Sequence, residues 1–221
     1  MNDTVLRYYN EGVGFVEVGR YLDALVCFEK AIAIDPEFEF AWNNRGVVLQ
    51  QLSRFVEALT SYNKAIAISP NFVSAWGNRG VILELLGRYE ESLATFDKII
   101  SLEPNNSGAW SNRGNVLQKL GRFEEAIASY DKAIAIKPDS FDPWFNRSGV
   151  LKNLGKYEES VASYDRVIAL KPTFARAWYK RGSVLDNLGK HSEARASYDR
   201  AIALDPNAAE SKDNLTISIE K

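Results

Sequence analysis

The sequence predicts an all-α repeat array built from antiparallel helix hairpins, because two kinds of residue return with one constant step. Five tryptophans are each separated by 34 residues, at Trp42, Trp76, Trp110, Trp144 and Trp178. Six prolines keep the same step, at Pro36, Pro70, Pro104, Pro138, Pro172 and Pro206. A fixed period of this length is typical of stacked supersecondary units, none of which can bury its apolar face alone.

The period divides the chain into six repeats and a tail. Placing the proline at position 32 of each repeat gives 5–38, 39–72, 73–106, 107–140, 141–174 and 175–208. In the tail, 209–221, Leu215 and Ile219 keep the inward spacing while Lys212 replaces the tryptophan. We therefore expect one solenoid over residues 1–221 that ends in a solvating cap helix.

Each repeat has the signals of two helices joined by a tight turn. In the fourth repeat Trp110, Leu117 and Leu120 recur at helical spacing, and the helix is expected to end at Gly121. Other repeats also have glycine at this position, which suits a left-handed backbone, except that Ser53 stands in the second. The second helix begins with an acid in its first turn and stops before the proline.

A glycine in the middle of the first helix predicts close helix packing. Such a glycine costs about 1 kcal/mol relative to alanine in a helix interior. It occurs at Gly12, Gly46, Gly80, Gly114 and Gly182. We expect it to meet the small residue of the second helix, at Ala24, Ala58, Ser92, Ala126, Ser160 or Ala194.

Composition excludes several classes of function. A net charge of -2 lacks the basic excess of a nucleic-acid-binding protein, and no apolar run is long enough to span a bilayer. The single cysteine, Cys27, cannot form an internal disulfide, which favours a reducing, cytoplasmic location. With one cysteine and one histidine, His191, the sequence predicts no metal site of the usual zinc kind, no cofactor and no catalytic residues. His191 takes a position that is otherwise aromatic, so we expect a structural role for it.

These residues resemble the tetratricopeptide repeat family. Tryptophan at position 4, glycine at 8, alanine at 20, an aromatic residue at 24, alanine at 27 and proline at 32 carry the resemblance over residues 5–208. The chain departs from the family at Tyr8, Ser148, Ile99 and Val167, and it has arginine where the family usually has leucine at position 7. The resemblance implies a right-handed superhelix whose first helices line a concave surface through positions 2, 5, 6, 9, 12 and 13.

On that surface, position 6 is asparagine in five successive repeats. These residues are Asn10, Asn44, Asn78, Asn112 and Asn146. An amide both donates and accepts hydrogen bonds, so a ladder of amides can hold the backbone of an extended peptide. The pattern is similar to the asparagine ladder of the superhelical repeat domain in O-linked N-acetylglucosamine transferase. Alternatively, asparagine is a neutral choice on a solvated face.

Apolar residues join the ladder toward the N-terminus and cations toward the C-terminus. The apolar candidates for peptide binding are Tyr9, Phe40, Val47 and Val81, with Leu6, Val13, Val16 and Leu85 beside them. An exposed apolar stripe marks an interaction site, although Leu6 and Tyr9 could instead pack against an N-terminal cap. The cationic end resembles the carboxylate clamp of chaperone-binding repeats in Asn115, Asn146, Arg176 and Lys180, with Ser111 in place of a lysine. That resemblance implies an acidic or C-terminal peptide segment as the ligand.

The sequence therefore predicts a non-enzymatic scaffold that binds an extended peptide or a partner protein. Two alternatives remain open. The chain could self-associate through its uncapped N-terminal repeat, or it could be the recruiting arm of a larger multiprotein or multidomain assembly.

Overall fold

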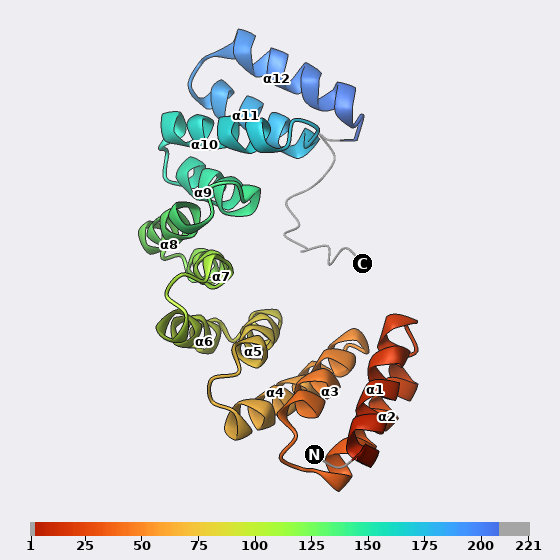
Figure 1. Cartoon of the computed structure of the whole chain (residues 1–221). Helices are drawn as coiled ribbons and strands as arrows, with labels where there is room; N and C mark the ends of the chain where they lie inside the picture. The colour runs from red at the N-terminus through yellow and green to blue at the C-terminus, as the bar shows by residue number, and fades with distance from the viewer. Residues whose placement is uncertain (1–2, 208–221) are drawn as a thin grey trace. The chain divides into compact units, whose positions relative to one another are not determined.

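The computed structural model describes residues 3–207, which form α-helices in consecutive pairs and no strand (Figure 1). The helices are α1 (Asp3–Glu17), α2 (Tyr21–Ile34), α3 (Glu39–Gln51), α4 (Phe55–Ile68), α5 (Val73–Leu85), α6 (Tyr89–Leu102), α7 (Ser107–Lys119), α8 (Phe123–Ile136), α9 (Phe141–Asn153), α10 (Tyr157–Leu170), α11 (Ala175–Asn187) and α12 (His191–Leu204). This confirms the predicted all-α solenoid of helix hairpins. The expected cap helix, 209–221, lies outside the described residues.

The chain divides into two compact units, residues 1–120 and residues 121–221. In unit 1, each helix from α1 to α6 packs on the next, and the first helices contact one another, α1 with α3 and α3 with α5. In unit 2, α9 packs between α8 and α10, and α11 packs between α10 and α12. The odd-numbered helices are the first helices of the repeats, so unit 1 presents four of them.

The turn between the two helices of a repeat has the predicted left-handed residue. Gly19, Gly87, Gly121, Gly155 and Gly189 have φ values of 72–73°. Ser53 has φ 59° and is the one residue other than glycine with positive φ in the described chain. The second helices end as predicted, since α2 stops at Ile34, two residues before Pro36.

The mid-helix glycine lies beside the small residue of the second helix, as expected, and it also makes room for the aromatic ring at position 24. A Cβ atom on Gly46 would lie 2.5 Å from Cε1 of Tyr62, and one on Gly80 would lie 2.6 Å from Cζ of Phe96. The small residue at position 20 is close by, because Ser92 Oγ donates to the Gly80 carbonyl oxygen at 2.8 Å. The ring at position 24 is nevertheless what excludes a side chain at position 8.

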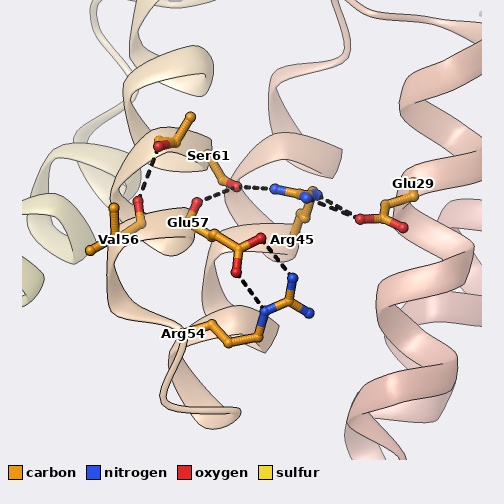
Figure 2. A network of polar contacts seen from close by, with 7 residues as sticks. Glu29, Arg45, Arg54, Val56, Glu57 and Ser61 are labelled. Carbon is orange, nitrogen blue, oxygen red and sulfur yellow. Dashed lines mark hydrogen bonds and ion pairs between the residues drawn. The ribbon is translucent and has the colours of Figure 1, made fainter.

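The arginine at position 7 links consecutive repeats, a role that the sequence left open. Figure 2 shows Arg45 between Glu29 on α2, with Nη2 and Oε1 3.0 Å apart, and Ser61 on α4, with Nη1 and Oγ 2.8 Å apart. Every later arginine at this position bonds to position 25 of the preceding repeat. These pairs are Arg79–Asn63, Arg113–Asp97, Arg147–Asp131 and Arg181–Asp165. A row of side-chain bonds thus holds the repeats of each unit in register.

The repeated tryptophan also has a defined polar contact. Its indole N–H donates to the carbonyl oxygen of the proline six residues earlier, for example from Trp76 to Pro70 at 2.9 Å. The same bond occurs in every repeat from the second to the sixth. It fastens the end of one repeat to the first helix of the next, and the two residues that define the period are therefore bonded to each other.

Candidate functional site

We call the side chains at positions 2, 5, 6, 9, 12 and 13 of α1, α3, α5 and α7 the first-helix face of unit 1. These positions follow helical i, i+3 and i+4 steps and share one side of each helix. The predicted site residues on it are Tyr9, Asn10, Phe40, Asn44, Val47, Asn78, Val81, Asn112 and Asn115. Asn10 is exposed, while Asn44, Asn78 and Asn112 are partly buried.

A chain of side-chain hydrogen bonds runs along this face from α1 to α5. Asn44 Nδ2 donates to the Tyr9 hydroxyl at 3.0 Å, and Asn43 Nδ2 donates to Asn44 Oδ1 at 3.2 Å. Asn78 Nδ2 in turn donates to Asn43 Oδ1 at 3.0 Å. Asn43 is only 8% exposed, so the residue at the centre of the chain is held inside the protein. The sequence did not indicate Asn43, whose role depends on packing between repeats.

The ladder amides keep hydrogen-bonding capacity beyond this chain. Asn78 uses one N–H and retains its second N–H and its carbonyl oxygen, and Asn44 retains one N–H. Within residues 3–207, the side chains of Asn10 and Asn112 make no hydrogen bond. The structure therefore connects Asn44 and Asn78 through Asn43 and does not bond Asn10 or Asn112 to them.

The apolar candidates are more deeply packed than the sequence suggested. Tyr9 lies against Phe28 and Phe38, with ring centroids 5.9 and 5.0 Å apart, and Val47 also packs on the core of unit 1. Val13 and Val16 join the same core, which corrects the expectation that the repeat core leaves them unexplained. Val81 is partly buried. The exposed apolar members are Leu6, Phe40 and Leu85.

One acid on the first-helix face has a perturbed environment. Glu84 on α5 is partly buried, and this burial raises the pKa of its carboxyl group, with Lys119 on α7 acting in the opposite direction. Glu84 is not among the residues predicted from the sequence, because an acid at a single position is informative only beside the contacts of its neighbours.

The candidates for a carboxylate clamp are divided between the two units. Asn115 lies on α7 in unit 1, whereas Asn146 lies on α9 and Arg176 and Lys180 lie on α11 in unit 2. The Arg176 guanidinium lies over the Phe145 ring, 5.6 Å from its centroid, and Arg176 Nε is buried without a hydrogen bond in the described part of the chain. A site shared by the four residues stays a prediction from the sequence.

Cys27 and His191 are the side chains that could in principle act as a nucleophile or a metal ligand. Cys27 is 7% exposed. Burial raises the pKa of its thiol most, and the nearby Glu11 charge raises it further. His191 is exposed, and its Nδ1 lies 3.1 Å from Asp186 Oδ1. Among residues 3–207, no group of histidine, cysteine and acidic side chains could hold a metal ion. The same residues include no helix long and apolar enough to cross a bilayer.

Comparison with protein families identifies the repeat. Sequence models described as tetratricopeptide repeat match residues 40–72, 73–106, 107–140 and 150–209, which is more than half of the chain. The chain belongs to the tetratricopeptide repeat family. A model of the protein prenyltransferase alpha subunit repeat also matches residues 21–52 of this tetratricopeptide repeat protein.

Solved structures share the tetratricopeptide repeat fold. The crystal structure of PilW, a widely conserved type IV pilus biogenesis factor, has 22% identity and a TM-score of 0.80, covering 92% of this chain and 94% of PilW. YrrB, a tetratricopeptide repeat protein with an unusual peptide-binding site, has 23% identity and a TM-score of 0.68, covering 85% and 98%. A tetratricopeptide repeat protein from Parabacteroides merdae has 20% identity and a TM-score of 0.79, covering 91% and 80%. A search of curated protein sequences gave no match.

Proposed function

We propose that this tetratricopeptide repeat protein is a non-enzymatic scaffold that binds an extended peptide segment of a partner protein along the first-helix face of unit 1. The observation that carries the proposal is the hydrogen-bond chain from Tyr9 through Asn44 and Asn43 to Asn78. It fixes two ladder amides, one repeat apart, in partly exposed positions. An extended peptide presents N–H and C=O groups at intervals, and amides can pair with both.

Fixing the amides before a ligand arrives favours binding. Ordering a free side chain on binding costs about 0.5–1.5 kcal/mol, and Asn44 and Asn78 are already held by their neighbours. Val47 and Val81, one turn further along α3 and α5, offer apolar contact beside each amide. The face thus combines backbone recognition with some selection of side chains.

The family supports the same kind of function. Tetratricopeptide repeat proteins bind protein or peptide partners, and YrrB is described by its peptide-binding site. For catalysis, Cys27 is a poor nucleophile because its buried thiol is held in the protonated form. We also propose a cytoplasmic location, on the basis of the single cysteine alone.

The test is partner capture by the double variant Asn78→Ala with Asn112→Ala. Each lost hydrogen bond contributes about 0.5–1.5 kcal/mol, so we expect the affinity for a captured peptide to fall by roughly 5- to 150-fold. Helicity is expected to stay close to that of the wild type, whereas the melting temperature falls because Asn78→Ala removes the donor to the buried Asn43 Oδ1. Capture is therefore measured well below the melting temperature of the variant. Asn105→Ala is the matched control, since Asn105 is an exposed turn residue of the same unit. Capture that survives the double substitution unchanged would contradict the proposal.

The remaining hypotheses have their own tests. Binding of an acidic or C-terminal segment by Arg176 and Lys180 in unit 2 stays a prediction, as do self-association through the N-terminal repeat and a recruiting role in a larger assembly. Sedimentation over the micromolar range decides self-association, because a monomer at every concentration removes it.

A further inference from the structure

A recurring hydrogen bond joins the two helices of a repeat, from the tyrosine at position 24 to the residue at position 12. In the second repeat, the Tyr62 hydroxyl donates to Gln50 Oε1 at 3.1 Å. In the sixth repeat, the Tyr198 hydroxyl donates to Asp186 Oδ2 at 2.9 Å. The oxygen at position 12, partly buried at Gln50 and exposed at Asp186, thus receives its donor from within the repeat.

The third repeat has the acceptor without the donor. Its position 12 is Glu84, and its position 24 is Phe96, which is 1% exposed and has no hydroxyl group. Within residues 3–207, Glu84 makes no side-chain hydrogen bond and no ion pair, and the one cation that acts on it, Lys119 on α7, does not offset the effect of burial on its pKa. Moving a carboxylate out of water without a hydrogen-bond partner costs free energy, and the same burial raises the pKa of Glu84. A cationic hydrogen-bond donor would therefore stabilise the charged form of Glu84.

Open space lies along α5 on the same side as Glu84. Gly77 precedes Glu84 by two helical turns, and a Cβ atom placed on Gly77 would have nothing within 4 Å. In the rest of unit 1 the same position carries larger residues, namely Tyr9, Asn43 and Ser111. Val81 lies between Gly77 and Glu84 in the helix, and Leu85 is 57% exposed. The stretch from Gly77 to Leu85 thus combines room, apolar contact and a carboxylate that makes no hydrogen bond or ion pair with the described residues.

We propose that Glu84 makes the first-helix face of unit 1 select peptides that carry a lysine or arginine. The aliphatic part of such a side chain lies on Val81 and Leu85, and its charged end donates to the Glu84 carboxylate. This inference rests on the proposed function, because the ladder at Asn44 and Asn78 holds the peptide that presents the basic side chain. It names the class of peptide, which the ladder alone does not.

The experiment selects binders from a random-sequence peptide library displayed on phage. We expect wild-type selections to be enriched in lysine and arginine, and Glu84→Gln selections to lose this enrichment. A selected peptide is expected to lose roughly tenfold in affinity for wild type when its basic residue is replaced by methionine, and to show no such loss with Glu84→Gln. Glu37→Gln is the matched control, since Glu37 is an exposed acid in unit 1 and the same charge is removed.

Phe96→Tyr provides a second variant that leaves the charge in place. It supplies the missing hydroxyl donor to Glu84, so enrichment in basic residues is expected to fall. The Phe96 ring presents Cζ to Gly80, whereas Tyr62 presents Cε1 to Gly46, so the new ring must turn to the Tyr62 orientation. If Phe96→Tyr does not fold, the comparison of Glu84→Gln with Glu37→Gln decides whether Glu84 selects basic residues.

The outcomes separate this inference from the proposed function. Peptides selected without excess lysine or arginine, or an excess that Glu84→Gln retains, overturn the role of Glu84 while peptide binding stands. Selections that yield no peptide overturn both. Loss of all binding in the Asn78 and Asn112 double variant, with the basic preference present in wild type, supports both.

Discussion

Arg45 bridges two second helices, with its Nη2 atom 3.0 Å from Glu29 Oε1 on α2 and its Nη1 atom 2.8 Å from Ser61 Oγ on α4. The arginine side chain is 17% exposed, and Ser61 is fully buried. A cation in this position is stabilised by partners on both sides, and removing it leaves polar groups unpaired. Packing between the first two repeats thus includes a polar link at a position where the family usually has leucine.

Arg45→Ala is expected to lower the free energy of unfolding by about 1.5–3 kcal/mol, because hydrogen bonds from a charged group are lost at a largely buried site. The matched control is Arg54→Ala, which removes an arginine bonded to Glu57 at the exposed start of α4. A surface pair of this kind contributes about 0–1 kcal/mol. Urea denaturation measures both variants. Equal losses would contradict a special role for Arg45.

Gly80→Ala and Gly77→Ala are expected to change stability in opposite directions, although both lie in α5. A Cβ atom on Gly80 would lie 2.6 Å from Phe96 Cζ, so the ring must shift, at a cost of about 1–3 kcal/mol. A Cβ atom on Gly77 meets nothing within 4 Å, and alanine gains up to about 1 kcal/mol in a helix interior. Thermal denaturation followed by circular dichroism tests this. Equal stability of the two variants would show that the helices adjust freely.

Ser53→Gly is expected to stabilise the protein by about 1 kcal/mol, because Ser53 has φ 59° and glycine adopts this left-handed conformation without strain. Ser69→Gly is the control, since Ser69 has φ -125° at the end of α4 and gains nothing from glycine. The free energy of unfolding in urea separates the two variants. A destabilised Ser53→Gly variant would contradict the argument from strain.

Glu84→Gln is expected to be more stable than the wild type at pH 7. Burial raises the pKa of Glu84, so the folded protein binds this proton more tightly than the unfolded chain does. The charged form therefore lowers stability once the pH rises above the unfolded pKa of about 4.3, and the penalty is complete above the folded pKa. The free energy of unfolding of Glu84→Gln and of the wild type is measured by urea denaturation from about pH 4 to about pH 7. The difference between the two proteins is expected to shrink toward the acid end. A difference that stays constant from about pH 7 to about pH 4 would contradict this argument.

Local signals in the sequence were sufficient to predict the helix hairpins. The left-handed turn at Gly87 and the end of α2 before Pro36 follow from backbone preferences of single residues, which act regardless of tertiary contacts. The partner of Arg45 could not be predicted in this way. It depends on how α3 packs against α2 and α4. The sequence shows only that arginine returns at position 7 from the second repeat on, and that position 25 is acidic in every repeat except the second.

The candidate site was predicted in outline and missed in detail. Helical spacing placed Asn44 and Asn78 on one face, but the bonds through Asn43 depend on the offset between neighbouring repeats. Glu84 was missed although its signal is present in the sequence. The phenylalanine at position 24 of the third repeat removes a hydroxyl that Tyr62 provides in the second, and only the bond from Tyr62 to Gln50 shows that this matters.

The bond from each indole to a proline carbonyl decides what fluorescence can report. The five tryptophans belong to the second through sixth repeats, whereas the first repeat has Tyr8 at the equivalent position. Emission excited selectively from tryptophan therefore follows the second to sixth repeats directly, and it senses the first hairpin only through Trp42, whose acceptor Pro36 lies just after α2. A population whose first hairpin has melted is expected to change the emission of Trp42 and to leave that of the other four tryptophans as in the native protein.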